Sequence, residues 1–297
     1  MNKKDFIHLQ QVTKDDVGKI LQKAKDFHRG TIKVPLFFEQ KPVLSTFFLE
    51  NSTRTKLSFQ KAAMDLGLHV LPFEIGSSSI NKSETIEDSL RCIEEMGVRL
   101  CVIRCKEEEL LSELAAKTSM SIISGGEGTK SHPSQALLDA ATMLNHFENL
   151  KGLKLSIVGD CKHSRVAHSH MDLAKLMGID LRFCGPDHFL SDEQALAKIS
   201  VEEALESSDI VMMLRIQFER HQNSFDTKDY LREFGLDELK LKNLNPSCKI
   251  MHPGPFNIGN EITRPVVESS QSLIWEQVKM SIPTRMAIIN DCLEGVL

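Results

Sequence analysis

The sequence predicts an α/β protein made of two doubly wound domains, each a mostly parallel sheet flanked by helices. Short apolar segments alternate with segments of helical periodicity along almost the whole chain, which is typical of parallel sheets covered on both faces. The length of 297 residues is enough for two domains of about 150 residues each. The spacing of the apolar segments favours two open sheets over one closed barrel.

Eight apolar segments are expected to form the strands. They are 43–49, 67–73, 99–104, 120–124, 153–159, 180–184, 209–214 and 248–251. The helices are expected at 53–66, 84–96, 107–117, 134–148, 164–177, 189–206 and 227–235. The segment 134–148 would be a long helix that links the two domains, and the turn at 149–152 would begin the second α/β unit.

Composition excludes several classes of protein. Hydrophobic residues make up 41% of the chain and charged residues 26%, as in ordinary globular proteins. The formal charge is −5 and no basic tract occurs, so nucleic acid is not expected as a partner. No apolar stretch is long enough to span a membrane, and none follows the lysines of residues 1–6 as it would in a signal peptide. We therefore expect a cytoplasmic protein with no membrane partner.

The cysteines and histidines do not predict a metal site. The seven cysteines are scattered and mostly in apolar surroundings, so buried free thiols in a reducing cytosol fit better than disulfides or zinc. Three histidines, His163, His168 and His170, are close in sequence. The last two lie two positions apart on a predicted helix and would point to different sides, which argues against a metal cluster.

Residues 51–55, Asn-Ser-Thr-Arg-Thr, lie where the strand at 43–49 turns into the helix at 53–66. Unpaired backbone N–H groups and the helix dipole at such a junction favour an anion. Arg54 adds a guanidinium fork that matches phosphate oxygens. An ordinary Ser/Thr helix cap beside a surface arginine is the alternative. The hydroxyls on both sides of Arg54 favour phosphate binding.

Polar residues follow most of the other predicted strands as well. Ligands of an open parallel sheet bind beyond the carboxyl ends of its strands. At these ends the sequence places four arginines, a lysine and a histidine without an obvious matching set of acids, which suits a phosphate with one or more carboxylates. The residues are Ser52–Thr55, Ser77–Lys82, Arg104, His132–Gln135, Arg165, Arg215–Gln217 and His252–Pro255.

The pattern of residues 153–165, an apolar strand followed by a glycine and a helix, resembles a nucleotide-binding βα turn. Only Gly159 is present, however, where a dinucleotide fingerprint needs three glycines. The glycine-lysine signature of a P-loop does not occur in the sequence either. Both an NAD-dependent dehydrogenase and a P-loop nucleotide-binding protein are therefore disfavoured.

A series of motifs, in this order and spacing, resembles the catalytic chains of aspartate carbamoyltransferases, in the aspartate/ornithine carbamoyltransferase superfamily. The likeness is colinear from Asp5 to the final helix. The motifs are Ser52–Thr55, Lys82–Thr85, Arg104, His132–Gln135, Ser164–Ser169, Arg215–Gln217 and His252–Pro255. The resemblance implies a carbamoyl-phosphate-binding domain of residues 1–133 and 285–297. It implies an aspartate-binding domain of residues 134–284, joined to the first by the linking helix and a C-terminal helix.

The resemblance also implies which residues bind each substrate. Carbamoyl phosphate would be bound by Ser52, Thr53, Arg54, Thr55, Arg104, His132, Gln135 and Pro255. Aspartate would be bound by Lys82, Arg165, Arg215, Gln217 and Gly254. The phosphate would lie on residues 52–55, and the amide on Gln135 and the backbone of the turn at 253–255. The two carboxylates of aspartate would be held by the three cations and Gln217.

The implied reaction is attack of the α-amine of L-aspartate on the carbonyl carbon, after which phosphate leaves toward Arg54. The catalytic residues would be Arg54 and the three that face the developing oxyanion, Thr55, Arg104 and His132. We expect His132 to act as a hydrogen-bond donor rather than as a full base. Since carbamoyl phosphate is already activated, the resemblance implies no nucleophilic side chain, no metal and no cofactor. Much of the rate would come from holding two anions together in one water-poor site.

The polar segment 77–82 would pass on composition for a flexible loop. The resemblance implies that this loop reaches the active site of a neighbouring subunit, with Ser78 and Lys82 as the matching positions. A homotrimer with shared active sites would then be the smallest active unit. The sequence leaves open whether regulatory chains or a dihydroorotase also bind.

Three positions depart from the family pattern. Ile258 stands where an arginine is usual, Ser83 stands where a glycine is usual beside the loop lysine, and Asn81 occupies a position that is often polar or basic. None of the core ligands is lost, which disfavours a non-catalytic homologue that acts as a binding or scaffold subunit. Altered substrate affinity is the expected consequence, with activity retained.

Ornithine carbamoyltransferases are the nearest alternative. Their motifs resemble H-P-C-Q and H-C-L-P at the two turns, and here the corresponding positions are Ser134 and Pro253. Arg165 and Arg215 would provide cations for a second carboxylate, whereas the distal amine of ornithine would need an acidic partner. The sequence therefore favours aspartate as the acceptor.

Overall fold

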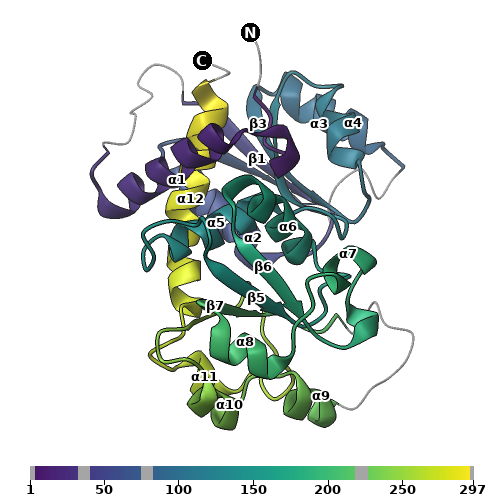
Figure 1. Ribbon diagram of the computed structural model, residues 1–297. Helices are drawn as coiled ribbons and strands as arrows, with labels where there is room; N and C mark the ends of the chain where they lie inside the picture. The colour runs from purple at the N-terminus through teal and green to yellow at the C-terminus, as the bar shows by residue number, and fades with distance from the viewer. Residues whose placement is uncertain (1–3, 33–40, 75–82, 218–226, 295–297) are drawn as a thin grey trace. The chain divides into compact units, whose positions relative to one another are not determined.

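The computed structural model describes residues 4–32, 41–74, 83–217 and 227–294, which form two compact units (Figure 1). The first unit contains Met1–Ala141 and Lys279–Leu297, and the second contains Thr142–Val278. Each unit has its own open sheet of four strands, and all of the strand pairs are parallel. The predicted α/β class with two doubly wound sheets is confirmed.

The sheet of the first unit has the strand order β2-β1-β3-β4. Its strands are β1 (Val43–Phe48), β2 (His69–Phe73), β3 (Val98–Cys105) and β4 (Ser121–Glu127). Its helices are α1 (Lys14–Arg29), α2 (Thr53–Asp65), α3 (Ile86–Glu95) and α4 (Leu110–Ala115). The middle of β3, residues 100–103, is apolar and buried, as expected for a strand covered on both faces. The ring of Phe47 on β1 stacks on that of Phe73 on β2, with centroids 4.3 Å apart.

The sheet of the second unit has the strand order β6-β5-β7-β8. Its strands are β5 (Lys154–Val158), β6 (Asp180–Cys184), β7 (Ile210–Met213) and β8 (Lys249–Met251). Its helices are α6 (Arg165–Met177), α7 (Asp192–Ala195), α8 (Val201–Ser207), α9 (Thr227–Glu233), α10 (Glu238–Asn243) and α11 (Arg264–Val267). Two further helices, α5 (Pro133–Met143) and α12 (Ile274–Glu294), each contain the boundary between the units.

One predicted helix, at 189–206, is wrong. The structure replaces it with the short helices α7 and α8. Between them Lys198 forms a parallel bridge with Phe183 of the edge strand β6, and the Ile199 N–H donates to the Phe183 carbonyl at 2.9 Å. The unpaired backbone of an edge strand therefore binds residues that would otherwise continue the helix. Helix α8 then starts afresh at Ser200, whose hydroxyl accepts from the first turn.

Other helices also differ from the prediction, among them α10 and α11, which were not predicted. Helix α1 was not predicted, although its sequence has both end signals: Thr13 and Asp16 form a capping box, and Gly30 ends the helix at a φ of 66°. The linking helix predicted at 134–148 ends at Met143, which makes α5 shorter than expected. All eight predicted strands are present, with ends that differ by a few residues at most.

All seven cysteines are free thiols, and all except Cys92 are buried. Burial raises the pKa of Cys184 and of Cys248 to about 12, so these thiols stay protonated and unreactive at neutral pH. None of the helices in the described ranges combines the length and apolarity needed to cross a bilayer. The same ranges contain no group of histidine, cysteine and acidic side chains that could hold a metal ion.

Candidate active-site residues

The motif at 52–55 forms the N-terminus of α2, at the carboxyl end of β1. Ser52 is the N-cap residue, and within the described ranges its hydroxyl accepts no hydrogen bond from the first turn. Thr53 and Arg54 are exposed, whereas the Thr55 side chain is buried. The first-turn N–H groups therefore lack the Ser52 cap that the alternative interpretation assumed. An uncapped helix N-terminus beside an exposed arginine is suited to bind an anion.

Arg104 lies at the end of β3, next to β1 in the sheet. Its Nε is 2.7 Å from Oε1 of Glu50, and its Nη1 donates to the carbonyl of Gly125 at 3.1 Å. A Cβ on Gly125 would lie 3.3 Å from the Arg104 Cβ and 3.2 Å from the carbonyl of Ile103, so glycine allows this close approach of β4 to β3. The guanidinium is thus held by an acid from one neighbouring strand end and a carbonyl from the other.

His132 and Gln135 are placed by the segment that leads from β4 into α5. Both side chains are buried, with exposed fractions of 4% and 8%. The hydroxyl of Ser134 lies 3.4 Å from Nδ1 of His132, and the Gln135 Nε2 donates to Oδ1 of the buried Asp139 at 3.0 Å. Because Asp139 fixes which end of the amide is nitrogen, Oε1 of Gln135 is directed away as an acceptor.

In the second unit, Arg165 and Arg215 follow two neighbouring strands. Arg165 begins α6 shortly after β5, Arg215 follows β7, and both are partly exposed. Gly159 separates β5 from this region, and a Cβ there would lie 2.8 Å from the Leu214 carbonyl. This glycine therefore serves the close approach of two strand ends, which explains why it stands alone without a dinucleotide fingerprint.

Gln217 joins this group through two hydrogen bonds. Its Nε2 donates to the carbonyl of His163 at 2.7 Å, and its backbone N–H donates to Oδ2 of Asp160 at 3.4 Å. Asp160 is fully buried, and its Oδ1 is 2.8 Å from Nδ1 of His163. The loop after β5 and the loop after β7 are therefore tied together at the side chains predicted to bind aspartate.

The turn at 252–255 follows β8 and is held by a buried histidine. Nδ1 of His252 accepts from the Gly254 N–H at 2.9 Å, so the ring proton must be on Nε2, which faces Oε1 of Glu261 at 3.3 Å. The same carboxylate oxygen accepts from the Asn257 N–H at 2.6 Å. The backbone of the turn, including the cis peptide bond between Gly254 and Pro255, is thereby fixed from inside the unit.

Some predicted positions are not placed by the structure. Ser78 and Lys82 lie outside the described residues. Ser83, just beyond them, has a φ of 75°, in the left-handed region that favours glycine, so the departure from the usual glycine places a serine in a strained conformation. Ile258, which replaces the usual arginine, is partly exposed to solvent, with 44% of its side chain accessible.

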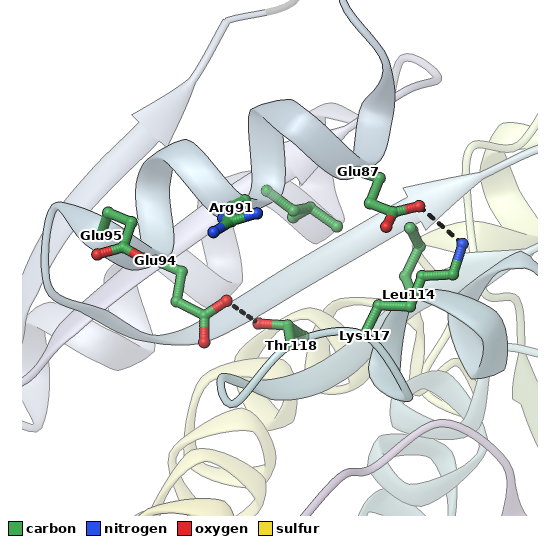
Figure 2. Close-up of a pocket in the computed structure, with 8 residues that line it drawn as sticks. Glu87, Arg91, Glu94, Glu95, Leu114, Lys117 and Thr118 are labelled. Atoms are coloured by element: carbon green, nitrogen blue, oxygen red, sulfur yellow. Dashed lines mark hydrogen bonds and ion pairs between the residues drawn. The ribbon is translucent and has the colours of Figure 1, made fainter.

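A pocket elsewhere in the first unit contains none of these residues. It lies between α3 and α4 and is lined mainly by charged side chains (Figure 2). Glu87 is ion-paired with Lys117 at 2.7 Å, and Glu94 accepts from the Thr118 hydroxyl at 2.7 Å. Three acids (Glu87, Glu94 and Glu95) and two cations (Arg91 and Lys117) line it, so opposite charges nearly balance and the pocket is not the cationic site that the sequence predicts.

Sequence reasoning missed three acids that fix site residues: Glu50, Asp160 and Glu261. The prediction of cations without matching acids is therefore wrong for Arg104, which Glu50 pairs. A signal existed for two of the three, since Glu50 and Asp160 directly follow predicted strands. The pairing partner of each could not be read from the sequence.

The chain matches two family models over nearly its whole length. The first, aspartate/ornithine carbamoyltransferase, carbamoyl-P binding domain, matches residues 4–145, and the second, the Asp/Orn binding domain of the same family, matches residues 151–292. The aspartate carbamoyltransferase catalytic subunit of Streptococcus pneumoniae (strain 70585) is 38% identical over 293 residues, which cover 97% of this chain and 94% of the relative.

Two solved structures are also similar. The catalytic subunit of M. jannaschii aspartate transcarbamoylase has a TM-score of 0.87 and 28% identity, with 98% of each chain covered. Aspartate transcarbamoylase from Trypanosoma cruzi, in complex with aspartate and phosphate, has a TM-score of 0.82 and 25% identity, with 97% of this chain and 95% of that chain covered.

Proposed function

This chain belongs to the aspartate/ornithine carbamoyltransferase family and has aspartate carbamoyltransferase activity, and we propose that the residues described above perform the transfer. The carbamoyl group of carbamoyl phosphate moves to the α-amine of L-aspartate, which gives N-carbamoyl-L-aspartate and phosphate for de novo pyrimidine biosynthesis. Residues 1–133 with 285–297 form the proposed carbamoyl-phosphate-binding domain and residues 134–284 the proposed aspartate-binding domain, with Gln135 and Pro255 of the second domain also assigned to carbamoyl phosphate and Lys82 of the first to aspartate.

The observation that best supports this assignment is the uncapped N-terminus of α2 with Arg54 exposed beside it. The phosphate is bound by the first-turn N–H groups, the hydroxyls of Ser52, Thr53 and Thr55, and the Arg54 fork. Since helix dipole and guanidinium both favour negative charge, they stabilise the phosphate increasingly as it becomes the leaving group.

The carbamoyl end is assigned to Arg104, His132, Gln135 and the backbone of Pro255. Arg104 and His132, with Thr55, donate hydrogen bonds to the carbonyl oxygen, which becomes an oxyanion in the transition state. The orientation of Gln135, with Nε2 on Asp139, leaves Oε1 to accept from the carbamoyl NH₂ group. The water-excluding burial of His132 and Gln135 strengthens these interactions.

Aspartate is assigned to Arg165, Arg215, Gln217, Lys82 and Gly254. Two arginines at neighbouring strand ends suit a substrate with two carboxylates, and the second N–H of the Gln217 amide is available to one of them. The attacking group is the α-amine, so no side-chain nucleophile takes part. The buried carboxylate of Asp160, in the loop after β5, has its two oxygens on His163 and on the Gln217 N–H, so it is poorly placed to bind the distal amine of ornithine.

A homotrimer with shared active sites is the proposed assembly, in which Ser78 and Lys82 serve the neighbouring subunit. The first unit has an exposed apolar surface that supports association with another copy. Leu57 and Met64 lie on one face of α2 and are more than half exposed, and Leu71 is exposed on β2, the edge strand of the sheet. The free thiols support a cytoplasmic location.

Phosphate release from carbamoyl phosphate, with L-aspartate or L-ornithine as acceptor, tests the function. Release that depends on aspartate, with N-carbamoyl-L-aspartate formed in equal amount, is the expected result. A faster reaction with ornithine would assign the chain to the other branch of the family. Absence of transfer to either acceptor would make it a non-catalytic homologue.

A further inference from the structure

A buried arginine from the C-terminal helix packs against the second turn of α2, one turn after the residues assigned to phosphate. Arg285 on α12 is 2% exposed, its guanidinium carbon lies 4.9 Å from the centroid of the Phe59 ring, and its Nη1 donates to the hydroxyl of Ser58. Phe59 and Ser58 both belong to α2. Among the described residues, the contacts of this guanidinium are thus concentrated on the helix whose N-terminus is assigned to phosphate.

Arg285 is charged at neutral pH in spite of its burial. Burial lowers the pKa of Arg285 to about 9, the carboxylate of Asp139 opposes this, and the charge of Arg104 adds to it. A buried positive charge therefore lies close to both the α2 helix and Arg104. In an interior of low polarity such a charge acts strongly on the hydrogen-bonding groups that it contacts.

The Ser58 hydroxyl links this charge to the peptide at the start of the helix. It accepts from Arg285 and donates to the carbonyl of Arg54, and the carbonyl of Thr55 is 3.1 Å away. The Arg54 carbonyl belongs to the same peptide group as the N–H of Thr55. A hydrogen bond to a peptide carbonyl polarises the whole group, so the N–H at its other end becomes a stronger donor.

We propose that Arg285 is a positioning residue for carbamoyl phosphate, which acts through Ser58 on the peptide between Arg54 and Thr55. The chain of hydrogen bonds fixes the orientation of that peptide and strengthens its N–H toward the phosphate. Arg285 itself does not contact the substrate in this role. The inference rests on the proposed function, since it assumes that phosphate binds at the first turn of α2.

Ser58→Ala tests the relay with little disturbance, because alanine is the best helix former and only one hydroxyl is lost. The matched control is Ser89→Ala, which removes another buried helical hydroxyl. This hydroxyl lies on α3 and donates to Glu84. We expect the Kd of inorganic phosphate, measured by calorimetry without aspartate, to rise about fivefold in Ser58→Ala and to stay unchanged in the control. The KM of carbamoyl phosphate should rise in parallel, with the KM of aspartate unchanged at saturating carbamoyl phosphate.

Arg285→Lys and Arg285→Gln supply the second arm. Lysine keeps the charge and should retain part of the phosphate affinity that glutamine loses. In the Ser58→Ala background, Arg285→Lys should cause no further loss, because the link is already broken. A Kd for phosphate in Ser58→Ala equal to that of the unmodified protein would overturn the proposal. If the Arg285 variants do not fold, the comparison of Ser58→Ala with the unmodified protein is sufficient to test it.

The outcome also separates this inference from the proposed function. If the unmodified protein transfers the carbamoyl group and Arg54→Ala loses phosphate binding, the α2 site is correct. Unchanged phosphate binding in Ser58→Ala would then contradict only the role of Arg285. If Arg54→Ala binds phosphate normally, the α2 site itself is wrong and the relay is wrong with it.

Discussion

The Nε atom of Arg104 lies 2.7 Å from Oε1 of Glu50, and both side chains are largely buried. Glu50 follows β1, and Arg104 is the penultimate residue of β3, the strand beside it, so the pair lies at the carboxyl ends of two adjacent strands. The arginine proposed to face the carbamoyl oxygen is therefore already oriented before a substrate binds. Preorganised donors of this kind are worth more in catalysis than mobile ones because they need not reorganise during the reaction.

Glu50→Ala should therefore lower kcat by about tenfold or more, because Arg104 loses the acid that fixes its fork. Glu50→Gln, which keeps the size of the side chain and a polar oxygen beside Nε but loses the charge of the ion pair, should lose less than alanine. Steady-state kinetics of both variants checks this, with Glu95→Ala, an exposed acid on α3, as the control. Equal activity of the alanine variant and the unmodified protein would remove the orienting role of Glu50.

Arg54→Ala should reduce kcat by about 100-fold or more and raise the KM of aspartate much less, because the negative charge on the leaving phosphate grows toward the transition state. Lys61→Ala is a suitable control on the same helix, since Lys61 is exposed and forms an ion pair with Asp65 one turn later. A kcat within a few-fold of that of the unmodified protein would mean that Arg54 does not bind the phosphate.

Arg215→Ala should raise the KM of aspartate by about 100-fold and leave the binding of carbamoyl phosphate largely intact, because a charged bidentate contact to the side-chain carboxylate is lost. Arg232→Ala, an exposed arginine on α9, should have no effect. Initial rates measured over a matrix of both substrate concentrations separate the two KM values. An equal rise in both would show that Arg215 does not discriminate aspartate.

Lys82→Ala and Arg54→Ala chains, each inactive alone, should regain partial activity when they are dissociated, mixed and reassembled. If Lys82 serves the neighbouring active site, some interfaces in a mixed trimer combine an intact loop from one chain with an intact phosphate site from the other. Recovery should stay well below the unmodified level because such interfaces are a minority. Subunit exchange is verified by native mass spectrometry, and zero recovery after exchange would place Lys82 in the site of its own chain.

His170 should make the protein less stable in acid. It is fully buried in α6, its Nδ1–H donates to the Val166 carbonyl at 2.9 Å, and burial lowers its pKa to about 4. An unfolded histidine has a pKa of about 6.5, so between these values the unfolded chain takes up the proton first. The contribution to stability is full above pH 6.5 and is lost as pH falls toward 4, by about 3 kcal/mol in total.

Urea unfolding between pH 7.5 and pH 4.5 measures this loss. His170→Asn keeps a side-chain N–H that can reach the Val166 carbonyl but cannot be protonated in this range, so its free energy of unfolding should fall less steeply with acid. His69→Asn, at an exposed position, should keep the slope of the unmodified protein. The same acid dependence in His170→Asn and the unmodified protein would show that another group causes it.

Local features of the sequence were sufficient for the strands and for the position of the motif at 52–55. The run at 43–49 is mostly apolar, short and rich in β-branched and aromatic residues, which together favour a strand buried on both faces. The motif at 52–55 was visible because a cluster of hydroxyls around an arginine stood at a strand-to-helix junction. Helix α1 was also within reach of the sequence, since its capping box and terminal glycine are local signals.

The tertiary structure decided what lies far apart in the chain. The helix predicted at 189–206 gave way to a bridge with Phe183, because an edge strand had backbone groups to satisfy. Glu50 meets Arg104 only through the register of β1 and β3, and Ser58 meets Arg285 across 227 positions of sequence. Periodicity and motif spacing report which residues face a core or a strand end. They do not report which side chain from another element arrives at the same place, because that depends on the packing of whole elements against one another.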